Sequence, residues 1–484
     1  MTTLLTANEI KEFIELDKTS TIKSYARKGQ DYYEGRHDIL DYRMFYYNND
    51  GDLVEDKYRN NAKIPHPFLT ELVDQATQFV MSGEPCFIKS KEPKLQAELD
   101  IYFNNNKRFK VELAETITGM QAKGFDYMFA YKDKNDRLAF ENADCLGVVE
   151  VEGRFAEDGK DQWIYRYLDR IDKDGKKQWK ILNIDDVATY YYVENDDGEI
   201  EFDEDVELNP KPHAVYMRKG KLYVKDLVMK PIFRLDHNKK KTSLLPVVKP
   251  LIDDYDIMSS SLTNNLVDFD TPLHVVKGYK GENLDKLQKN LKTKKMVGVS
   301  DNGGVEVHTV NVPYEARKIK MELDEKNIYR FGMGLNMQGL KDTAATTNIA
   351  IKAAYSLLEL RCNKIIDQLE LFLQEIVEVV LAEINEKNNT AYKLSDVEFN
   401  IVPEIMSNST ENAQQELTDA QKRQADVNTL LSVASMFDNE TVMKKLCEIL
   451  DVDYNEIKSK LPNPDEPTGV IDTAADDLGG GVIA

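Results

Sequence analysis

Cysteine is scarce in this chain, and its spacing excludes two common kinds of stabilising site. Structural zinc sites and disulfide frameworks need cysteines at short, recurring spacings. The 484 residues contain no CxxC pair, and their four cysteines lie far apart, at Cys86, Cys145, Cys362 and Cys447. We therefore expect reduced thiols packed inside the fold, as is usual for a protein of the cytosol.

Long hydrophobic runs are also missing. No stretch approaches the ~18 consecutive apolar residues that a membrane-spanning helix needs. The segment Met1–Glu9 lacks the basic start and the sustained apolar core of a signal peptide. We expect a soluble, unsecreted protein with no membrane partner.

Positive charge is in deficit. The chain carries 63 lysines and arginines against 85 aspartates and glutamates, which gives a formal net charge of −22. Proteins that grip duplex DNA tightly bind its phosphates through basic patches. The overall balance therefore argues against a tight phosphate clamp, although it is compatible with a surface that touches nucleic acid weakly and lets it slide.

Cofactor motifs are present only in broken form. The segment Gly334–Lys341 nearly spells a phosphate-binding loop, but Leu340 precedes the lysine, Asp342 follows it, and a predicted helix stands where a strand is needed. The six histidines show neither HExxH nor a pair at helical spacing. Hairpin turns explain the aspartate-glycine clusters better than calcium loops do, because no carboxylate occupies the first ligand position before Gly51, Gly175 or Gly198. We expect no cofactor, no metal and no catalytic residue.

Three neighbouring aspartates leave one enzymatic alternative open. Asp253, Asp254 and Asp256 lie on one predicted amphipathic helix, and grouped carboxylates can hold Mg²⁺ for a nuclease. No clustered partner residue accompanies them in the sequence, so a solvated helix face is the plainer interpretation. A magnesium-dependent DNA-processing enzyme is the alternative function.

The hydrophobic period changes along the chain and divides it into regions. Residues 1–125 follow mostly the 3.6-residue period of helices, and residues 126–236 follow the two-residue period of short antiparallel strands. A helix, a compact α/β insert, a returning helix and a polar connector come next. Beyond the following long helix we expect a lone strand at Val397–Val402 that joins the earlier β region, and then further helices. The fold class is α+β.

The longest predicted helix organises the rest. From Asn348 to Glu386 the sequence keeps helical periodicity with no Gly or Pro, which at 1.5 Å per residue predicts a rod of roughly 55–60 Å. Its second half is apolar on more than one side, so neighbouring segments must cover it. It is either a spine to which other segments dock or a long core helix of a large α domain, and the pattern leaves both open.

Two local features are candidates for contact with phosphate or with an acidic partner. The insert concentrates lysines, although such runs are often only a soluble surface. The connector Leu335–Thr347 is polar and should project as a loop between two helices, where function often concentrates. The lysines of the insert are Lys286, Lys289, Lys292, Lys294 and Lys295, and the polar residues of the connector are Asn336, Gln338, Lys341, Asp342, Thr343 and Thr346.

Several blocks of the sequence resemble the portal proteins of tailed bacteriophages that infect Gram-positive hosts. The resemblance covers about residues 20–400 and rests on the order of the blocks. These are Tyr32–Gly35, Ile64–Phe68, Pro250–Asp256, Leu284–Leu291 and Asp324–Phe331, followed by the connector and the long helix. One step departs from the family pattern, because Thr347-Asn348 stands where Ser-Gly is common.

The resemblance implies a portal-like, ring-forming fold. Residues 1–125, mainly helical, and 126–236, antiparallel β, would form a wing that a return strand at 396–404 completes. Two stem helices, 246–271 and 313–333, would carry a small α/β clip at 273–312. A tunnel loop, 335–347, would lead into the spine helix, 348–386. Helices within 411–461 would form the crown, and residues 462–484 would be an acidic, disordered tail.

The same resemblance implies a ring, usually dodecameric, at one capsid vertex, through which double-stranded DNA is packaged and ejected. The polar tunnel-loop residues would face DNA, and the clip lysines would face DNA, the terminase or head-completion adaptor proteins. Major capsid and scaffolding proteins would be further partners. The ring would assemble in the host cytoplasm and end in the virion. A helical scaffold or adaptor without a channel is a further alternative.

Overall fold

In a computed structural model of the chain, two compact units are seen, and each is described by itself. The first comprises Met1–Ala344 with Lys352–Ile405, and the second comprises Ala345–Ile351 with Met406–Ala484. The structure describes residues 5–57, 59–83, 86–133, 137–152, 161–170, 177–195, 197–213, 215–218, 221–224, 231–269, 273–277, 304–308, 314–336, 348–404, 409–450 and 454.

The chain begins with two capped helices and a small hairpin. The Thr6 side chain accepts from the Glu9 amide while the Glu9 carboxylate accepts from the Thr6 amide, so the two residues form a capping box. Ser20 caps the second helix in a similar way, by accepting from the Lys23 amide. The elements are α1 (Ala7–Lys18), α2 (Thr21–Tyr33), the 3-10 turn Asp38–Asp41, β1 (Phe45–Tyr47) and β2 (Leu53–Glu55).

A second group of helices forms the layer against which the long helix packs. Their buried residues fall at helical spacing, as in Leu69, Leu72, Val73 and Ala76 of the first of them. The elements are α3 (Phe68–Val80), β3 (Ile88–Lys89), α4 (Pro93–Leu99), a π-helical turn (Asp100–Asn104) and α5 (Lys107–Lys123).

The predicted β region is present as separate antiparallel sheets. A three-stranded sheet has the order β14-β4-β5, a six-stranded sheet has the order β10-β9-β8-β7-β6 with β11 paired to β9, and β12 pairs with β13. The strands are β4 (Phe125–Lys132), β5 (Leu138–Ala143), β6 (Val148–Val151), β7 (Gln162–Arg170), β8 (Lys177–Ile184), β9 (Ala188–Glu194), β10 (Ile200–Phe202), β11 (Lys211–Pro212), β12 (Val215–Arg218), β13 (Lys221–Val224) and β14 (Ile232–Asp236).

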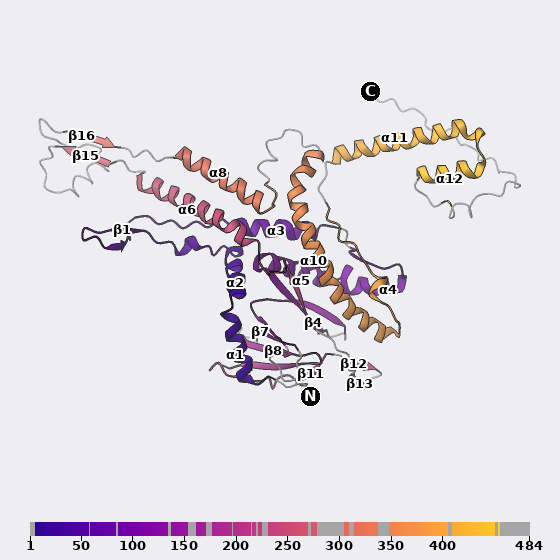
Figure 1. The fold of residues 1–484 in the computed structure, drawn as a ribbon, viewed down its shortest axis with the longest axis horizontal. Helices are drawn as coiled ribbons and strands as arrows, with labels where there is room; N and C mark the ends of the chain where they lie inside the picture. The colour runs from indigo at the N-terminus through magenta and orange to yellow at the C-terminus, as the bar shows by residue number, and fades with distance from the viewer. Residues whose placement is uncertain are drawn as a thin grey trace, which may run out of the picture. The chain divides into compact units, whose positions relative to one another are not determined.

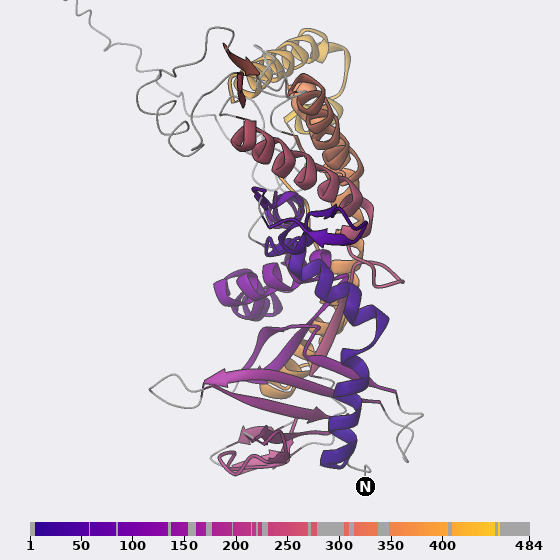
Figure 2. The same cartoon turned by 90° about the vertical axis from the view of Figure 1, so that its left-hand side faces the viewer.

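The six-stranded sheet is covered on both faces. Ile10 and Ile14 of α1 share a buried cluster with Ile164 and Ile181 on one face. On the other face, Tyr165 belongs to a cluster that reaches into the three-stranded sheet. Figure 2 shows α1 lying across this sheet. Gly51 and Gly198 have positive φ in the β1–β2 and β9–β10 turns, so the hairpin interpretation is confirmed for these two clusters; Gly175 lies outside the described residues.

Two long helices pack against each other and continue into a short strand pair. The helices are α6 (Leu245–Phe269) and α8 (Tyr314–Phe331), and the strands between them in the sequence are β15 (Leu273–Lys277) and β16 (Gly304–His308), which pair in antiparallel register. Figure 1 shows α6 between α8 and the β1–β2 hairpin. The predicted order of helix, insert and returning helix is therefore confirmed where the structure describes it.

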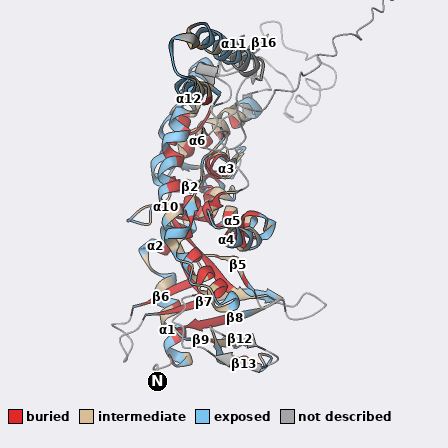
Figure 3. Cartoon of the chain, turned by 90° about the vertical axis from the view of Figure 1, so that its right-hand side faces the viewer, coloured by how far each residue is buried: buried red, intermediate tan, exposed pale blue. Residues whose placement is uncertain are grey.

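The long helix is confirmed and slightly longer than expected. α10 runs from Asn348 to Asn388 over 41 residues. From Leu358 to Ile384 its buried side chains join one large cluster with α3, α5 and the three-stranded sheet. Figure 3 shows this burial around α5 and the exposed outer side of α10. Of the two interpretations of this helix, the structure favours a spine that other segments cover.

The partner that we expected for the lone strand near residue 397 is wrong. β17 is only Glu398–Phe399, and it pairs with β3, where Phe399 lies opposite Ile88 and Glu398 opposite Lys89. Before it stands a 3-10 turn, Leu394–Asp396. β3 lies in the helical N-terminal region, so the returning chain closes on that region and not on the sheets of residues 125–236.

In the second unit, two helices pack on each other. They are α11 (Ser409–Val433) and α12 (Asn439–Leu450), with a 3-10 turn (Ala434–Met436) between them, in the part of the chain where further helices were expected. The four cysteines are free thiols, as predicted. Across the described part of the chain, no helix combines the length and apolarity needed to cross a membrane.

Candidate functional site

The structure describes one of the eleven residues that the sequence marks as candidates. Asn336 lies at the end of the segment that follows α8, and its side chain hydrogen-bonds the Glu325 carboxylate. The other candidates lie outside the described residues. They are Gln338, Lys341, Asp342, Thr343 and Thr346 of the connector, and Lys286, Lys289, Lys292, Lys294 and Lys295 of the insert. The site is therefore built from the residues that hold the upstream end of the connector, and from the polar and apolar clusters of the described residues.

The upstream end of the connector is fixed to α3 by a two-way amide contact. Gln75 donates from Nε2 to the Leu335 carbonyl oxygen at 3.0 Å, and its Oε1 accepts from the Leu335 amide at 3.0 Å. Leu335 itself is buried. One side chain thus satisfies both backbone groups of this residue, and so sets the point from which the connector departs.

The glycines just before this point are needed for close packing. A Cβ atom on Gly334 would lie 2.2 Å from Leu72 Cδ2, and one on Gly332 would lie 2.6 Å from Leu72 Cδ1. Helix α8 precedes them, and no strand does, as expected. Gly334, the first glycine of the near phosphate-binding motif, is therefore explained by the approach of the α8 end to α3; the second, Gly339, lies outside the described residues.

A buried arginine on α10 joins the connector's upstream end to three other elements. Arg361 donates from NH1 to the carbonyl oxygens of Leu72 at 3.0 Å and Gly332 at 3.3 Å, and from NH2 to Gln121 Oε1 at 2.5 Å. Its Nε has no hydrogen-bond partner among the described residues. Burial lowers the pKa of Arg361 to about 10, so the side chain is still charged at neutral pH. α3, α5, α10 and the upstream end of the connector therefore meet at a positive charge whose hydrogen-bond acceptors are all neutral.

Sequence reasoning missed Arg361, although a signal was present. It is a charged residue inside a run whose neighbours Leu358, Cys362 and Ile365 form a buried apolar stripe. A charge on such a stripe must find partners, because an unpaired buried charge is very costly. Its partners are backbone carbonyls and an amide far away in the sequence, which no local pattern identifies.

A ladder of polar side chains fixes α6 to an extended segment of the chain. The amides of Ala62, Ile64 and His66 donate to Asn264 Oδ1 at 2.7 Å, Ser260 Oγ at 3.1 Å and Asp256 Oδ1 at 2.9 Å. Two residues of extended chain advance about 6.6 Å and four residues of helix advance about 6 Å, so the two repeats stay in step. Asp256, Ser260 and Asn264 are all buried.

Two histidines contact Asp256, the residue at one end of this ladder. His37 Nδ1 lies 2.7 Å from Asp256 Oδ2, and His66 Nδ1 lies 2.8 Å from Asp256 Oδ1. The His37 ring also stacks on Tyr32, with 4.4 Å between ring centroids. Asp256 is fully buried. The expected solvated helix face is therefore wrong for this residue, because the histidines and the extended segment that cover it come from distant parts of the sequence.

The other two aspartates of α6 have cationic partners of their own. Asp253 pairs with Lys249 at 2.6 Å and accepts from the Tyr32 hydroxyl. Asp254 pairs with Lys320 of α8, which also pairs with Asp324. The three aspartates thus point to three separate partners, so this arrangement does not favour a shared magnesium site.

A cation already occupies the one metal-like cluster found in the described ranges. Asp126, Asp144 and Cys145 bring their ligand atoms together. The Lys123 ammonium lies 3.0 Å from Asp126 and 2.8 Å from Asp144, so it supplies the positive charge that a metal would bring. Burial raises the pKa of Asp126 to about 6 despite this ammonium. The cluster is a buried ion-pair network.

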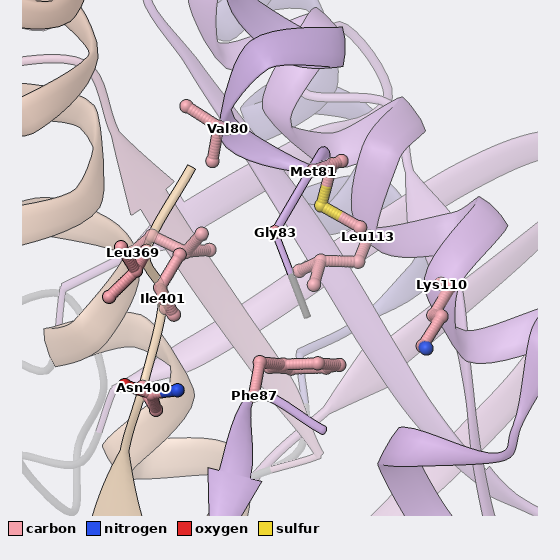
Figure 4. Close-up of a pocket in the computed structure, with 10 residues that line it drawn as sticks. Val80, Met81, Gly83, Phe87, Lys110, Leu113, Leu369, Asn400 and Ile401 are labelled. Carbon is pink, nitrogen blue, oxygen red and sulfur yellow. The ribbon is translucent and has the colours of Figure 1, made fainter. Parts of the chain in front are cut away.

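A mainly apolar pocket lies between α3, α5, α10 and the chain after β17. Its volume is about 440 Å³ with the open mouth included. Figure 4 shows the Met81, Leu113 and Leu369 side chains around it, with Lys110 at one edge. Lys110 Nζ lies 5.7 Å from the Phe87 ring centroid. Apart from Lys110, the described lining residues have no group suited to acid-base or nucleophilic chemistry, so the pocket favours a packing role.

Comparison with known proteins gives one family. The model described as "Phage portal protein, SPP1 Gp6-like" matches residues 14–454 of this chain. The portal protein of Bacillus phage SPP1 is 28% identical over 341 residues, which are 69% of this chain and 65% of the relative. The portal protein of Clostridium phage phiCD119 is 28% identical over 188 residues, 38% of this chain and 40% of the relative. The matched segments thus span less than two thirds of either relative.

Two solved structures are weakly similar. A chain from the neck of a native gene transfer agent particle, computed with C12 symmetry, has 12% identity and a TM-score of 0.39, over 78% of this chain and 90% of that one. A chain from the virion of a native gene transfer agent particle has 12% identity and a TM-score of 0.38, over 80% of this chain and 91% of that one. TM-scores of this size do not establish a shared fold.

Proposed function

Since the chain belongs to the family of phage portal proteins described as SPP1 Gp6-like, we propose that its copies close into a ring around a channel for double-stranded DNA. The ring stands at one vertex of the capsid, and the genome is packaged and ejected through it. Twelve copies is the number that the resemblance implies. The observation that carries this proposal is the extent of the family match, which takes in both units of the chain.

Each region of the chain takes a part in the proposed ring. Helices α6 and α8 form the stem, and residues 273–312 form the clip, which faces DNA, the terminase or the head-completion adaptor. Residues 335–347 form the tunnel loop, and α10 is the spine. Residues 1–236 with the return strand at 396–404 form the wing, and helices within 411–461 form the crown. The major capsid and scaffolding proteins are further proposed partners of the ring. The packing of α6 on α8, with the insert between them in the sequence, supports this assignment.

The charge of the chain suits passage of DNA more than capture of it. A ring of subunits that each carry a formal charge of −22 repels phosphate. Each contact between a side chain and a phosphate adds affinity for DNA. Because the loop and the clip offer only a few lysines and amides, their contacts with DNA are weak and exchange quickly. In this proposal, Lys341 and the insert lysines are such contacts.

Uncovered apolar side chains on the proposed stem support assembly. Val247, Ile257, Leu266 and Val267 of α6 are exposed, as are Tyr314, Ile319 and Leu323 of α8. So many exposed apolar side chains on two adjacent helices are unusual for a protein that stays monomeric. Neighbouring copies in the ring would cover them.

Imaging of the purified protein tests the ring directly. We expect closed rings with a hole of DNA width in negative stain, and one dominant oligomer by native mass spectrometry, with the chain alone or with its assembly partners. A chain that stays monomeric at micromolar concentration under both conditions, or rings too narrow for a double helix, would contradict the proposal.

Deletion of Gln338–Thr343 separates assembly from transport. We expect rings to form as before, because the connector's upstream anchor is Leu335, held by Gln75 outside the deleted segment. DNA packaging should fall strongly. A matched variant that replaces the same residues with glycine and serine keeps the length and removes Lys341 and Asp342. Unchanged packaging in both variants would show that the loop does not act on DNA.

A further inference from the structure

The β1–β2 hairpin carries an uncovered apolar surface. We call residues 42–56 the hairpin arm. Its two strands pair Phe45 with Glu55, Tyr46 with Val54 and Tyr47 with Leu53. All of its strand residues except Glu55 are exposed, with exposed fractions from 37% at Val54 to 74% at Tyr47. A two-stranded hairpin alone in water is marginally stable at best, and this one has apolar side chains on both faces.

One face of the arm is more open than the other. Residues paired across an antiparallel ladder share a face, so Phe45, Tyr47 and Leu53 lie together, and Tyr46 and Val54 lie on the reverse. The first three expose 53%, 74% and 59% of their surface, and the reverse pair exposes 42% and 37%. The face with Phe45, Tyr47 and Leu53 is therefore the less covered of the two within the described part of the chain.

The base of the arm is anchored, so the arm is held in a defined place. Asn61 Nδ2 donates to the Tyr42 carbonyl oxygen at 3.1 Å, and Lys63 Nζ donates to the Leu40 carbonyl oxygen at 2.5 Å. The ladder on α6 begins at Ala62, which lies between these two anchoring residues in the sequence. Tyr42, Phe45 and Tyr46 of the arm line a polar groove together with Asn264 of α6 and Arg317 of α8. The arm is presented beside the helix pair without packing into it.

α8 carries a complementary surface. Ile319 and Leu323 lie four residues apart on one helical face and expose 63% and 52% of their surface. In Figure 1 the arm and α8 lie on opposite sides of α6. A ring is built from heterologous contacts, in which one side of each copy meets the opposite side of the next. The two uncovered surfaces therefore have the placement that such a contact requires.

Charge favours the same pairing. The arm contains one cation, Arg43, and four acidic residues, Asp50, Asp52, Glu55 and Asp56, which leaves a net charge of −3. The exposed face of α8 has three cations, Lys318, Lys326 and Arg330, against Glu315 and Glu322, which leaves a net charge of +1. In an acidic chain, a basic helix face is a suitable neighbour for an acidic arm.

We propose that the Phe45–Tyr47–Leu53 face of the hairpin arm docks on the Ile319–Leu323 face of α8 in a second copy of this chain. The contact is part of the subunit interface of the ring and rests on the proposed function. In this contact the hairpin gains from its neighbour an apolar cover that the described residues of its own chain do not give.

Cross-linking between two single-cysteine variants tests the contact. Tyr47→Cys chains that carry a mass tag are mixed with untagged Leu323→Cys chains under assembly conditions, and mild oxidant is added. We expect a disulfide-linked mixed dimer on non-reducing gels. The native cysteines give little background, because three are buried and Cys86 is half-buried. A matched control replaces Leu323→Cys by Leu16→Cys, which lies on α1 and is 59% exposed; this pair should not link.

The result separates this inference from the proposed function. If wild-type chains form rings and the Tyr47–Leu323 pair does not link, or links no better than the control pair, the docking is wrong and the ring stands. If wild-type chains form no rings alone or with assembly partners, both the docking contact and the proposed ring are wrong.

A second variant measures the contribution of the contact. Tyr47→Ser with Leu53→Ser should lower the ring-to-monomer ratio at least about tenfold in native mass spectrometry, because buried aromatic anchors dominate interface energies. The midpoint of thermal unfolding of the monomer should hardly change, since both side chains are exposed there. Asp50→Ser at the turn is the matched control and should keep the ratio. Rings that form equally well in the double variant would overturn the proposal.

Discussion

Two buried charges on the same helix are held in opposite ways. Glu383, near the end of α10, is completely buried and pairs with Lys132 at 2.5 Å and Lys387 at 2.8 Å, and it accepts from the Tyr102 hydroxyl at 2.8 Å. Arg361, nearer the connector, has only carbonyl and amide acceptors. One charge is neutralised locally, and the other is not.

The difference predicts which end of α10 stays packed and which end opens first. A buried ion pair with further hydrogen bonds is expensive to open, because opening leaves an unpaired charge in the interior. Bonds from Arg361 to backbone carbonyls can be exchanged for bonds to water at lower cost, since no opposite charge is left behind. We therefore expect the Glu383 end of the spine to stay closed while the end near the proposed tunnel loop is the first to open.

Replacing the carboxylate should have the largest effect. Glu383→Gln keeps the shape but removes the carboxylate charge that pairs with Lys132, and we expect a loss of about 3 kcal/mol, the low end of the range for broken buried pairs, because Lys132 is slightly exposed. The midpoint of thermal unfolding measures this loss. Glu378→Gln, on the exposed side of the same helix, is the matched control and should change stability by less than about 0.5 kcal/mol.

The same pair predicts a pH dependence. Burial alone would raise the pKa of Glu383, but the Lys132 ammonium and the hydrogen bonds from Lys132, Lys387 and Tyr102 outweigh it and hold the pKa below its usual 4.5. The stabilisation is therefore present above about pH 4.5 and is lost as the pH falls through the lowered pKa of the folded state. Wild type and Glu383→Gln should converge in stability in acid. A constant difference at all pH values would contradict the ion pair.

Removal of the arginine should cost less and act locally. Arg361→Met fills much of the same space but leaves the Leu72 and Gly332 carbonyl oxygens and Gln121 Oε1 without their donor, so we expect a loss of about 1–3 kcal/mol. Amide hydrogen exchange should speed up around Gly332–Asn336 and stay unchanged around Glu383. Faster exchange at both ends of α10 would show that the two ends are one cooperative unit.

The sequence predicts the elements of this protein well and their partners poorly. The period of apolar residues identifies α6, α8 and α10, because that signal is local. It does not reveal that β17 pairs with β3, since two short strands on separate segments have no recognisable pairing code. The polar stripe of Asp256, Ser260 and Asn264 is visible at a spacing of four residues, but what covers it is not.

The candidate site shows the same limit. The connector is recognisable from its polarity and from its place between helices. Its anchors are Gln75 and Arg361, and their partners lie 260 residues away for Gln75 and up to 289 residues away for Arg361. Contacts over such separations depend on the fold as a whole, so composition and local period cannot supply them.

Giving Arg361 a carboxylate partner would make its surroundings similar to those of Glu383. It therefore tests whether the missing counter-charge causes the difference between the two ends of α10. Gln121→Glu places a carboxylate where Oε1 already accepts from Arg361 NH2, and the Thr77 hydroxyl, which now accepts from Gln121 Nε2, can turn to donate. Because the arginine is already desolvated, only the new carboxylate adds a desolvation cost, and we expect a net stabilisation of about 1 kcal/mol at neutral pH. It should vanish in acid as the carboxylate is protonated. Gln121→Leu, which cannot accept, should instead destabilise the chain, and slower hydrogen exchange at Gly332–Asn336 in Gln121→Glu alone would show that the missing counter-charge is what leaves this end of α10 free to open.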